Sequence, residues 1–253
     1  MTRILVPYHL DERLADLDFP LRPDMTIATD LPAGDPWSRM AHLYERVAAS
    51  VENVVRSGAR PIVISGDCTT SLGTIAGLQR AGLDPAIIWL DAHGDVQTLE
   101  TTASGYLGGM PLRILVGYRP ELISEILALR VVREDRVLLV GARDLDPPEL
   151  RYLEQAAIHR CGVDELHAAD LPAGPLYLHL DADVVDPGEL PGLLFPAPGG
   201  PPMSQVTAAL RRVFESGRVA AFGLACSWRS GRETGERLRP HLETAMLAGA
   251  PGV

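Results

Sequence analysis

Short runs of apolar residues recur along the chain, with helical patterns between several of them. Six such runs occur, at residues 4–6, 62–64, 86–90, 137–140, 176–180 and 219–225. Strands that are apolar throughout belong to a parallel sheet that helices cover on both faces. The pattern therefore predicts an α/β fold with three layers, α/β/α, around a mostly parallel central sheet.

Helical periodicity fills several gaps between these runs. Asp35 is placed to cap a helix that begins at Pro36, and its apolar residues recur every three or four positions until Gly58 ends it. We predict further helices at residues 71–80, from Pro147 to about residue 157, and after Ser204 as the capping residue.

Two stretches lack both patterns and are expected as loops. Residues 10–35 are rich in Asp and Pro, and residues 188–202 are rich in Gly and Pro and should lie next to any site at the strand ends. Neither a repeat nor a low-complexity tract interrupts the chain. We expect residues 1–253 to form one domain.

Composition excludes several classes of partner. The net charge of −10 and the pI near 5.1 argue against binding to nucleic acid or an anionic membrane. No apolar run approaches the roughly 18 residues of a membrane span, and the N-terminus does not read as a signal peptide. Three cysteines form no disulfide framework. We expect a cytoplasmic protein that acts on a small molecule, and the sequence leaves self-association open.

Acidic residues follow three of the predicted strands. Residues 66–68 read Gly-Asp-Cys, residues 91–95 read Asp-Ala-His-Gly-Asp, and residues 181–183 read Asp-Ala-Asp. Ligand sites of open α/β sheets lie at the carboxyl ends of the strands. Residues two apart in an extended segment point the same way, so each cluster should present its donors to one side.

These donors predict a pair of divalent cations. Unpaired buried carboxylates cost several kcal/mol each, and cations would neutralise them. Oxygen-rich sites with one nitrogen suit Mn²⁺ or Mg²⁺, with Zn²⁺ also compatible. Two such ions about 3.5–4 Å apart activate a hydroxide for attack on an electrophilic carbon. The residues alone indicate a two-metal hydrolase.

The same motifs resemble those of the arginase (ureohydrolase) family, which includes arginase, agmatinase, guanidinobutyrase and formiminoglutamase. The family motifs Gly-Asp-His, Asp-Ala-His-x-Asp and Asp-x-Asp-x-x-Asp-Pro correspond to residues 66–68, 91–95 and 181–187. The resemblance covers residues 62–187 and, more faintly, the rest. It implies an α/β/α fold and two Mn²⁺ ions as cofactor. It also implies hydrolysis of a linear C–N bond in a guanidino amino acid by a metal-bridging hydroxide.

The resemblance also implies six metal ligands, which are Cys68, Asp91, His93, Asp95, Asp181 and Asp183. In this assignment Asp91 and Asp181 bridge the two ions. Asp95 completes the site of Cys68 and is the implied catalytic residue.

Cys68 stands where the family carries a histidine. A thiolate ligand would favour Zn²⁺ or Fe²⁺ at its site, whereas the alternative is a small buried hydrophobe. The Nω-hydroxy-L-arginine hydrolase subgroup also has cysteine here and is similar over residues 91–111. This likeness implies a modified substrate such as N-hydroxyarginine.

Four residues match family positions that hold an amino-acid substrate. Gln97 and Ser104 correspond to contacts of the α-carboxylate, and Asp146 and Glu149 to contacts of the α-amino group. The alternative for Asp146 is a turn and helix start, because Asp before Pro-Pro commonly opens a helix.

Two departures from the family leave other activities open. Gly108 stands at the position of the proton-shuttle histidine. Trp228 lies near the position of the acid that pairs with the guanidinium, and it would offer an aromatic face or be an interior ring. Glu233 or Glu236, in the loop that follows, is the alternative source of the acid. An amidino, ureido or formimino hydrolase, or a degenerate member that only binds metal, are therefore alternatives.

Overall fold

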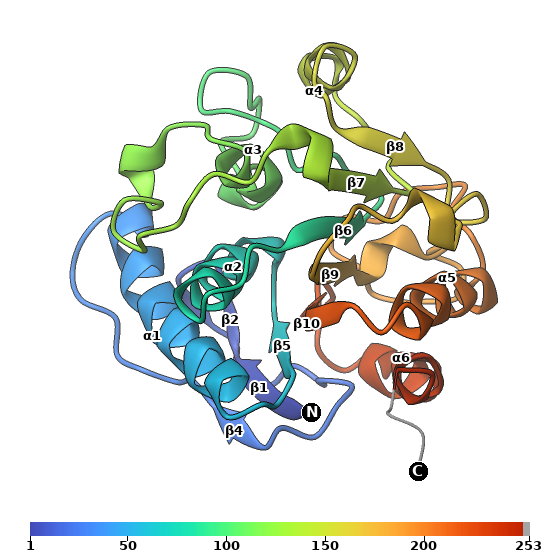
Figure 1. The fold of residues 1–253 in the computed structure, drawn as a ribbon, viewed down its shortest axis with the longest axis horizontal. Coiled ribbons are helices and arrows are strands. Elements are labelled where there is room, and N and C mark those ends of the chain that lie inside the picture. Colours follow the sequence, from blue (N-terminus) through green and yellow to red (C-terminus); the bar gives the residue numbers. More distant parts are fainter. Residues whose placement is uncertain (250–253) are drawn as a thin grey trace.

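The central element of the protein is an eight-stranded parallel sheet (Figure 1), seen in a computed structural model that describes residues 1–249. Its strand order is β4-β1-β5-β10-β9-β6-β7-β8. The strands are β1 (Thr2–Val6), β4 (Met25–Thr26), β5 (Pro61–Ser65), β6 (Ala86–Leu90), β7 (Val137–Val140), β8 (His159–Cys161), β9 (Leu176–Asp181) and β10 (Val219–Ala225). A separate antiparallel pair is formed by β2 (Tyr8–His9) and β3 (Glu12–Arg13).

Helices cover both faces of the sheet, which confirms the predicted three-layer α/β/α fold (Figure 1). One face carries α1 (Pro36–Arg56), α2 (Ser71–Arg80) and α3 (Pro111–Leu115), and the other carries α5 (Met203–Glu215) and α6 (Thr234–Leu247). The helix α4 (Pro147–Leu153) lies near β8. Residues alternate between the layers along each strand: Trp89 packs towards α1 and α2, whereas Ile88 and Leu90 pack towards α5 and α6.

The packing of α2 against α1 places the start of α2 beside the acidic clusters. Asp35 caps α1 by accepting a hydrogen bond from the Ser38 N–H at 3.2 Å. Two glycines of α2 allow the close approach, because a Cβ on Gly77 would lie 2.5 Å from the Ala48 carbonyl oxygen. The short helix that contains Cys68 runs directly into α2, so this contact fixes the position of the thiol.

Several boundaries differ from the sequence-based predictions. The helix α4 ends at Leu153 rather than near residue 157. Ser204 does not cap α5, because α5 begins at Met203 and Ser204 lies inside the helix. The Met203 N–H donates instead to Glu189 Oε2 at 2.7 Å. The polar edge strand β8 and the helix α6, which contains Pro240, were not predicted. Residues 10–35 are mostly loop, as expected.

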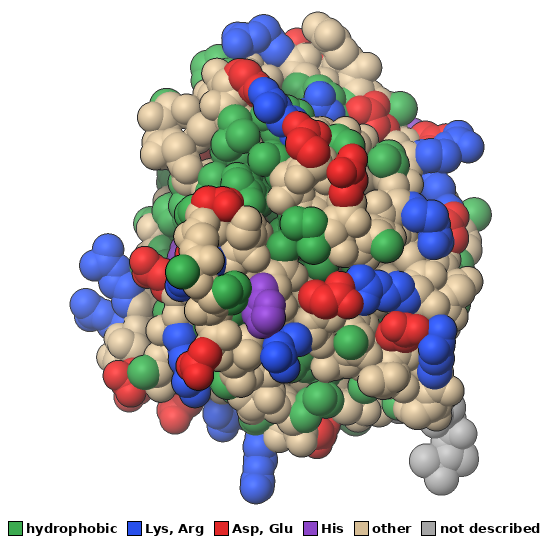
Figure 2. Space-filling model, turned by 90° about the vertical axis from the view of Figure 1, so that its left-hand side faces the viewer, with side chains coloured by type: hydrophobic (Ala, Val, Ile, Leu, Met, Phe, Trp, Pro, Cys, Tyr) green, Lys and Arg blue, Asp and Glu red, His purple; other side chains and the backbone are tan. Residues whose placement is uncertain are grey.

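Acidic and basic side chains are interspersed over the face that carries α1 (Figure 2). Arg80 on α2 pairs with Glu45 on α1 at 2.6 Å, and Arg56 pairs with Glu52 at 2.7 Å. Within residues 1–249, none of the helices has the length and apolar character needed to traverse a membrane.

Candidate active site

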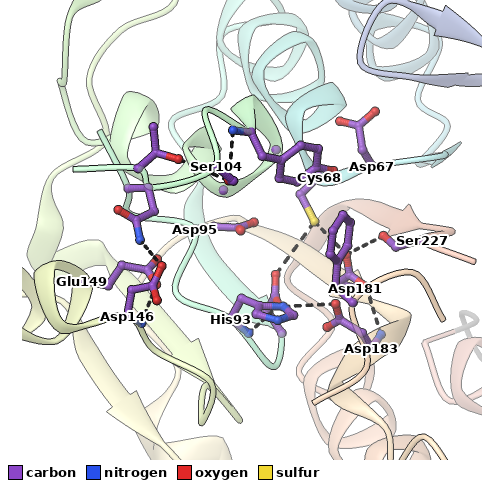
Figure 3. Close-up of a pocket in the computed structure, with 17 residues that line it drawn as sticks. Asp67, Cys68, His93, Asp95, Ser104, Asp146, Glu149, Asp181, Asp183 and Ser227 are labelled. Atoms are coloured by element: carbon purple, nitrogen blue, oxygen red, sulfur yellow. Dashed lines mark hydrogen bonds and ion pairs between the residues drawn. The ribbon is translucent and has the colours of Figure 1, made fainter. Parts of the chain in front are cut away.

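The acidic clusters meet at the carboxyl ends of four neighbouring strands (Figure 3). Cys68 follows β5, Ser227 follows β10, Asp181 ends β9, and Asp91 follows β6. These strands are adjacent in the sheet in this order, although they are far apart in the sequence. The parallel arrangement therefore gathers side chains from four segments into one place.

Asp91 and Asp181 each accept a hydrogen bond from the backbone N–H two residues later, and these bonds turn the chain sharply at the strand ends. Asp91 Oδ1 accepts from the His93 N–H at 2.7 Å, and Asp181 Oδ1 accepts from the Asp183 N–H at 2.9 Å, where a 3₁₀ helix begins. Asp95 adopts a left-handed conformation with φ of 53°. The prediction that extended backbone aligns these donors is wrong. Tight turns bring them together instead.

The donor atoms form two groups that share Asp91. In the first, Cys68 Sγ lies 3.0 Å from Asp181 Oδ2 and 3.8 Å from Asp91 Oδ2. In the second, His93 Nδ1 lies 3.4 Å from Asp91 Oδ1 and 3.1 Å from Asp183 Oδ2. The two oxygens of Asp91 thus face different groups, as a carboxylate between two ions would.

Four carboxyl groups are buried here with little compensating charge. Burial and the neighbouring carboxylates raise the pKa of Asp95 and Asp183 well above the ordinary value, and burial raises that of Asp181 to about 6. Burial opposes ionisation of Asp91 as well, but the hydrogen bonds from His93 and its positive charge together outweigh burial and lower the pKa of Asp91. Burial lowers the pKa of His93, yet its contacts with Asp183 and Asp91 raise it to about 12. Among the described residues that line the site, His93 is the only basic one.

Divalent cations fit this donor set. Asp95 Oδ2 is buried, and residues 1–249 provide it with no hydrogen-bond partner. Burial and the nearby aspartates raise the pKa of the Cys68 thiol well above its usual value. A buried oxygen without a partner and a cluster of mutually repelling acids both gain from a bound cation, which binds their deprotonated forms.

The clusters line a cavity of about 440 Å³, and four predicted substrate contacts also line it. Gln97 Nε2 donates to Asp146 Oδ2 at 2.7 Å, and Ser104 lines another part of the same cavity. Glu149 accepts the N–H groups of Val96 at 3.2 Å and Asp146 at 3.1 Å. The Glu149 carboxylate therefore holds the start of α4 against the loop after β6. Asp146 caps α4 in a capping box with Glu149, which confirms the predicted helix start, and it also lines the cavity.

The structure corrects the expectation for Trp228. Its indole N–H donates to Asp18 Oδ1 at 2.9 Å, and its ring is only 3% exposed, in the core beside α6. The residue on the cavity wall is its neighbour Ser227, whose hydroxyl donates to Asp181 Oδ2 at 2.8 Å. Within the described part of the chain, neither Glu233 nor Glu236 reaches the cavity wall.

Comparison with known proteins agrees with this geometry. The sequence profile of the Arginase family matches residues 7–226. The chain belongs to the arginase family. The arginase of Bacillus subtilis (strain 168) is 29% identical over 236 residues, which are 84% of this chain and 78% of that protein. The arginase of Bacillus caldovelox is 32% identical over 175 residues, which are 64% and 58% of the two sequences.

Solved structures of arginase-family proteins share the fold. The native Bacillus caldovelox arginase superposes with a TM-score of 0.83 at 24% identity, covering 100% of this chain and 99% of that one. The formimidoylglutamase of Bacillus subtilis gives a TM-score of 0.73 at 17% identity, with 98% and 86% covered. Membership in the arginase family makes the chain a metal-dependent hydrolase of carbon–nitrogen bonds other than peptide bonds.

Three residues that the motifs did not single out lie at the cavity or against its wall. Tyr106 and Phe195 line the cavity, with ring centroids 5.0 Å apart. A Cβ on Gly108 would lie 2.3 Å from the Tyr106 hydroxyl, so the missing side chain at 108 makes room for the Tyr106 ring. His179 lies against Cys68 and stays neutral, because burial lowers its pKa to about 3. Alternation along β9 would have found His179, since it points the same way as Asp181.

Proposed function

We propose that the protein is a binuclear metal-dependent hydrolase that cleaves a linear C–N bond in a guanidino amino acid or an N-hydroxylated relative. One observation carries this proposal. Side chains from three separate strand ends place the predicted ligands around one cavity, where their carboxyl groups are at most 5% exposed. A catalytically idle protein would have little reason to keep such a cluster, because buried acids without cations destabilise the fold.

The residues would divide between two ions. His93 and Asp183 would hold one, Cys68 and Asp95 the other, and Asp91 would contribute an oxygen to each. Oxygen with one nitrogen suits Mn²⁺, whereas the sulfur of Cys68 favours Zn²⁺ or Fe²⁺ at its site. Bound divalent cations supply Lewis-acid polarisation of the substrate and lower the pKa of water.

Two side chains of the cavity are placed to handle protons. The carboxylate of Asp95 points into the space between the donor groups (Figure 3), and whichever of its oxygens does not bind the ion can accept a proton from the attacking water. The Tyr106 hydroxyl lies 3.0 Å from His9 Nε2 and occupies the space that a side chain at Gly108 would need. His9 Nδ1 faces the Gly66 carbonyl oxygen at 3.0 Å and donates to it, so His9 Nε2 accepts the Tyr106 hydroxyl proton at rest. We assign Tyr106 as the hydrogen-bond donor to the departing nitrogen, towards which its hydroxyl rotates from His9.

The remaining wall defines the substrate class. Asp146, oriented by Gln97, is placed to bind an α-amino group. Asp67 also lines the cavity, but its oxygens accept the N–H groups of Thr69 at 2.7 Å and Leu10 at 2.6 Å. The Asp67 carboxylate is therefore not free to pair with a substrate guanidinium in the described cavity. This favours a less basic group, such as N-hydroxyguanidine, over plain guanidinium.

Metal reconstitution followed by a substrate panel tests the proposal. Metal-free protein given Mn²⁺ should bind close to two ions per chain, and Asp91→Ala should lose both because Asp91 faces both groups. The surface variant Asp135→Asn serves as the control and should bind like wild type. Retention of both ions by Asp91→Ala would contradict the ligand assignment.

The panel contains N-hydroxy-L-arginine, L-arginine, agmatine, and ureido and formimino amino acids. We expect N-hydroxy-L-arginine to be hydrolysed fastest and agmatine to be a poor substrate because it lacks the α-carboxylate. Hydrolysis of only the ureido or formimino compounds would assign the alternative activity. No hydrolysis of any compound by protein that holds two ions would refute the proposed function.

A further inference from the structure

His179 is a fully buried imidazole beside the proposed metal centre, and none of the family motifs includes it. It lies on β9, two residues before Asp181, and is 1% exposed. Its Nε2 is 3.2 Å from Cys68 Sγ. The chain thus has a cysteine where the family has a histidine, and it places another histidine directly against the sulfur of that cysteine.

The side-chain donor atoms of Cys68, Asp91 and His179 have the spacing of metal ligands. Atoms of Cys68, Asp91 and His179 all lie within 4.8 Å of one another. In a tetrahedral zinc site, with sulfur at about 2.3 Å and nitrogen at about 2.0 Å, two ligand atoms are separated by about 3.5 Å. The sulfur here lies 3.2 Å from His179 Nε2 and 3.8 Å from Asp91 Oδ2. Small side-chain shifts would place all three around one ion.

The imidazole is held in the orientation that this role requires. His179 Nδ1 lies 3.2 Å from Ser71 Oγ and 3.3 Å from the Tyr177 hydroxyl. The ring stacks on Trp89 with centroids 3.8 Å apart, and the Trp89 indole N–H donates to Asp91 Oδ2 at 3.1 Å. Metal-binding histidines characteristically have their second nitrogen hydrogen-bonded in this way, which fixes the ring and leaves the other nitrogen free for the ion.

We propose that His179 is a metal ligand, which together with Cys68 and Asp91 forms a mixed sulfur, nitrogen and oxygen site at the buried side of the cavity. Such a donor set selects a borderline-soft ion, Zn²⁺ or Fe²⁺, over Mn²⁺ or Mg²⁺. The inference rests on the proposed function only in requiring that the cavity binds divalent cations. It makes the two metal positions chemically unequal.

X-ray absorption at the zinc edge tests the assignment without measuring catalysis. Metal-free protein receives one equivalent of Zn²⁺, and the spectrum reports sulfur and imidazole scattering separately. The His93→Asn variant removes the imidazole of the oxygen-rich site and directs the ion to Cys68. We expect both sulfur and imidazole scattering in His93→Asn, and loss of the imidazole signal when His179→Gln is added.

A second measurement compares affinities. His179→Gln should weaken Zn²⁺ binding by more than about 100-fold, beyond the roughly 10–100-fold that loss of an outer-shell partner costs, while the second ion binds as before. His42→Gln removes an exposed imidazole on α1 and should leave the affinity unchanged. Circular dichroism in EDTA checks the fold of each variant. If His179→Gln does not fold, the X-ray absorption spectrum of His93→Asn still tests the assignment, because that variant keeps His179.

The outcomes separate this inference from the proposed function. Sulfur scattering without imidazole in His93→Asn overturns the inference alone, since His179 would then act only by hydrogen bonding to Cys68. Imidazole scattering that persists in the double variant overturns it as well. Failure of the wild-type protein to retain Zn²⁺ or Mn²⁺ overturns the proposed function, and this inference with it.

Discussion

Replacing Asp181 by asparagine should have opposite effects with and without metal. Asp181 Oδ2 accepts hydrogen bonds from Ser227 and Cys68, and Oδ1 accepts from the Asp183 N–H. Asparagine has nearly the same shape and can keep one backbone and one side-chain contact. The substitution therefore removes mainly the negative charge, which is costly to bury beside the other acids in the metal-free protein and which would bind the ions in the proposed loaded protein.

The pKa of Asp181 sets the size of the first effect. Burial raises it from 3.8 to about 6 in the metal-free fold, so the folded state favours the protonated acid. The contribution of protonated Asp181 to the free energy of unfolding is fully present below pH 3.8 and is lost as the pH rises through about 6. At pH 8 the loss is on the order of 3 kcal/mol, which Asp181→Asn should recover. For a protein of this length, this corresponds to a rise of roughly 6–12 °C in Tm.

Thermal unfolding followed by circular dichroism measures both effects. In EDTA at pH 8, Asp181→Asn should have a higher Tm than wild type. At pH 4 the free energies of unfolding of the two proteins should differ by less than about 1 kcal/mol. Saturating Mn²⁺ should raise the Tm of wild type strongly and that of Asp181→Asn little, because ions that bind only the folded state stabilise it. A variant that melts below wild type in EDTA at pH 8 would refute the reasoning that the buried charge of Asp181 destabilises the metal-free fold.

Three further predictions concern individual side chains. Tyr106→Phe should lower kcat by about 100-fold with unchanged metal content, as expected for loss of a proton donor; an unchanged kcat would rule out that role. Bound Zn²⁺ should protect Cys68 from iodoacetamide, and equal alkylation rates with and without the ion would show that the sulfur is not a ligand. Asp146→Asn should raise KM about 10-fold for an α-amino acid substrate but hardly for its deaminated analogue, because a charge-assisted hydrogen bond is lost. Equal effects on both substrates would contradict the amino-group contact.

The apolar runs of the sequence were sufficient to locate most of the sheet. The strands β6, β7 and β10 have the predicted limits, because strands buried on both faces are apolar throughout and polar residues mark their ends. The pattern was insufficient at the periphery. The strand β8 has only one neighbour in the sheet and is largely exposed, so its sequence His-Arg-Cys carries no apolar signal.

The family also followed from the sequence, and the six predicted ligands lie together at the cavity, because metal ligation requires specific side-chain types close to strand ends. Residues 91–95 and 181–183 carry those types in a spacing that few other functions need. The local geometry did not follow. Asp91 and Asp181 form turns with their own backbone, and these turns rather than an extended strand bring the donors together.

Only the tertiary structure decided which other side chains reach the cavity. Trp228 follows a strand that ends at the site, yet its ring turns into the core to meet Asp18, more than 200 positions away in the chain. Tyr106 enters because Gly108 leaves space for it and His9 holds its hydroxyl. A sequence pattern reports the faces and ends of single elements, whereas these contacts depend on which distant segments pack together, and that information arises only when the chain folds.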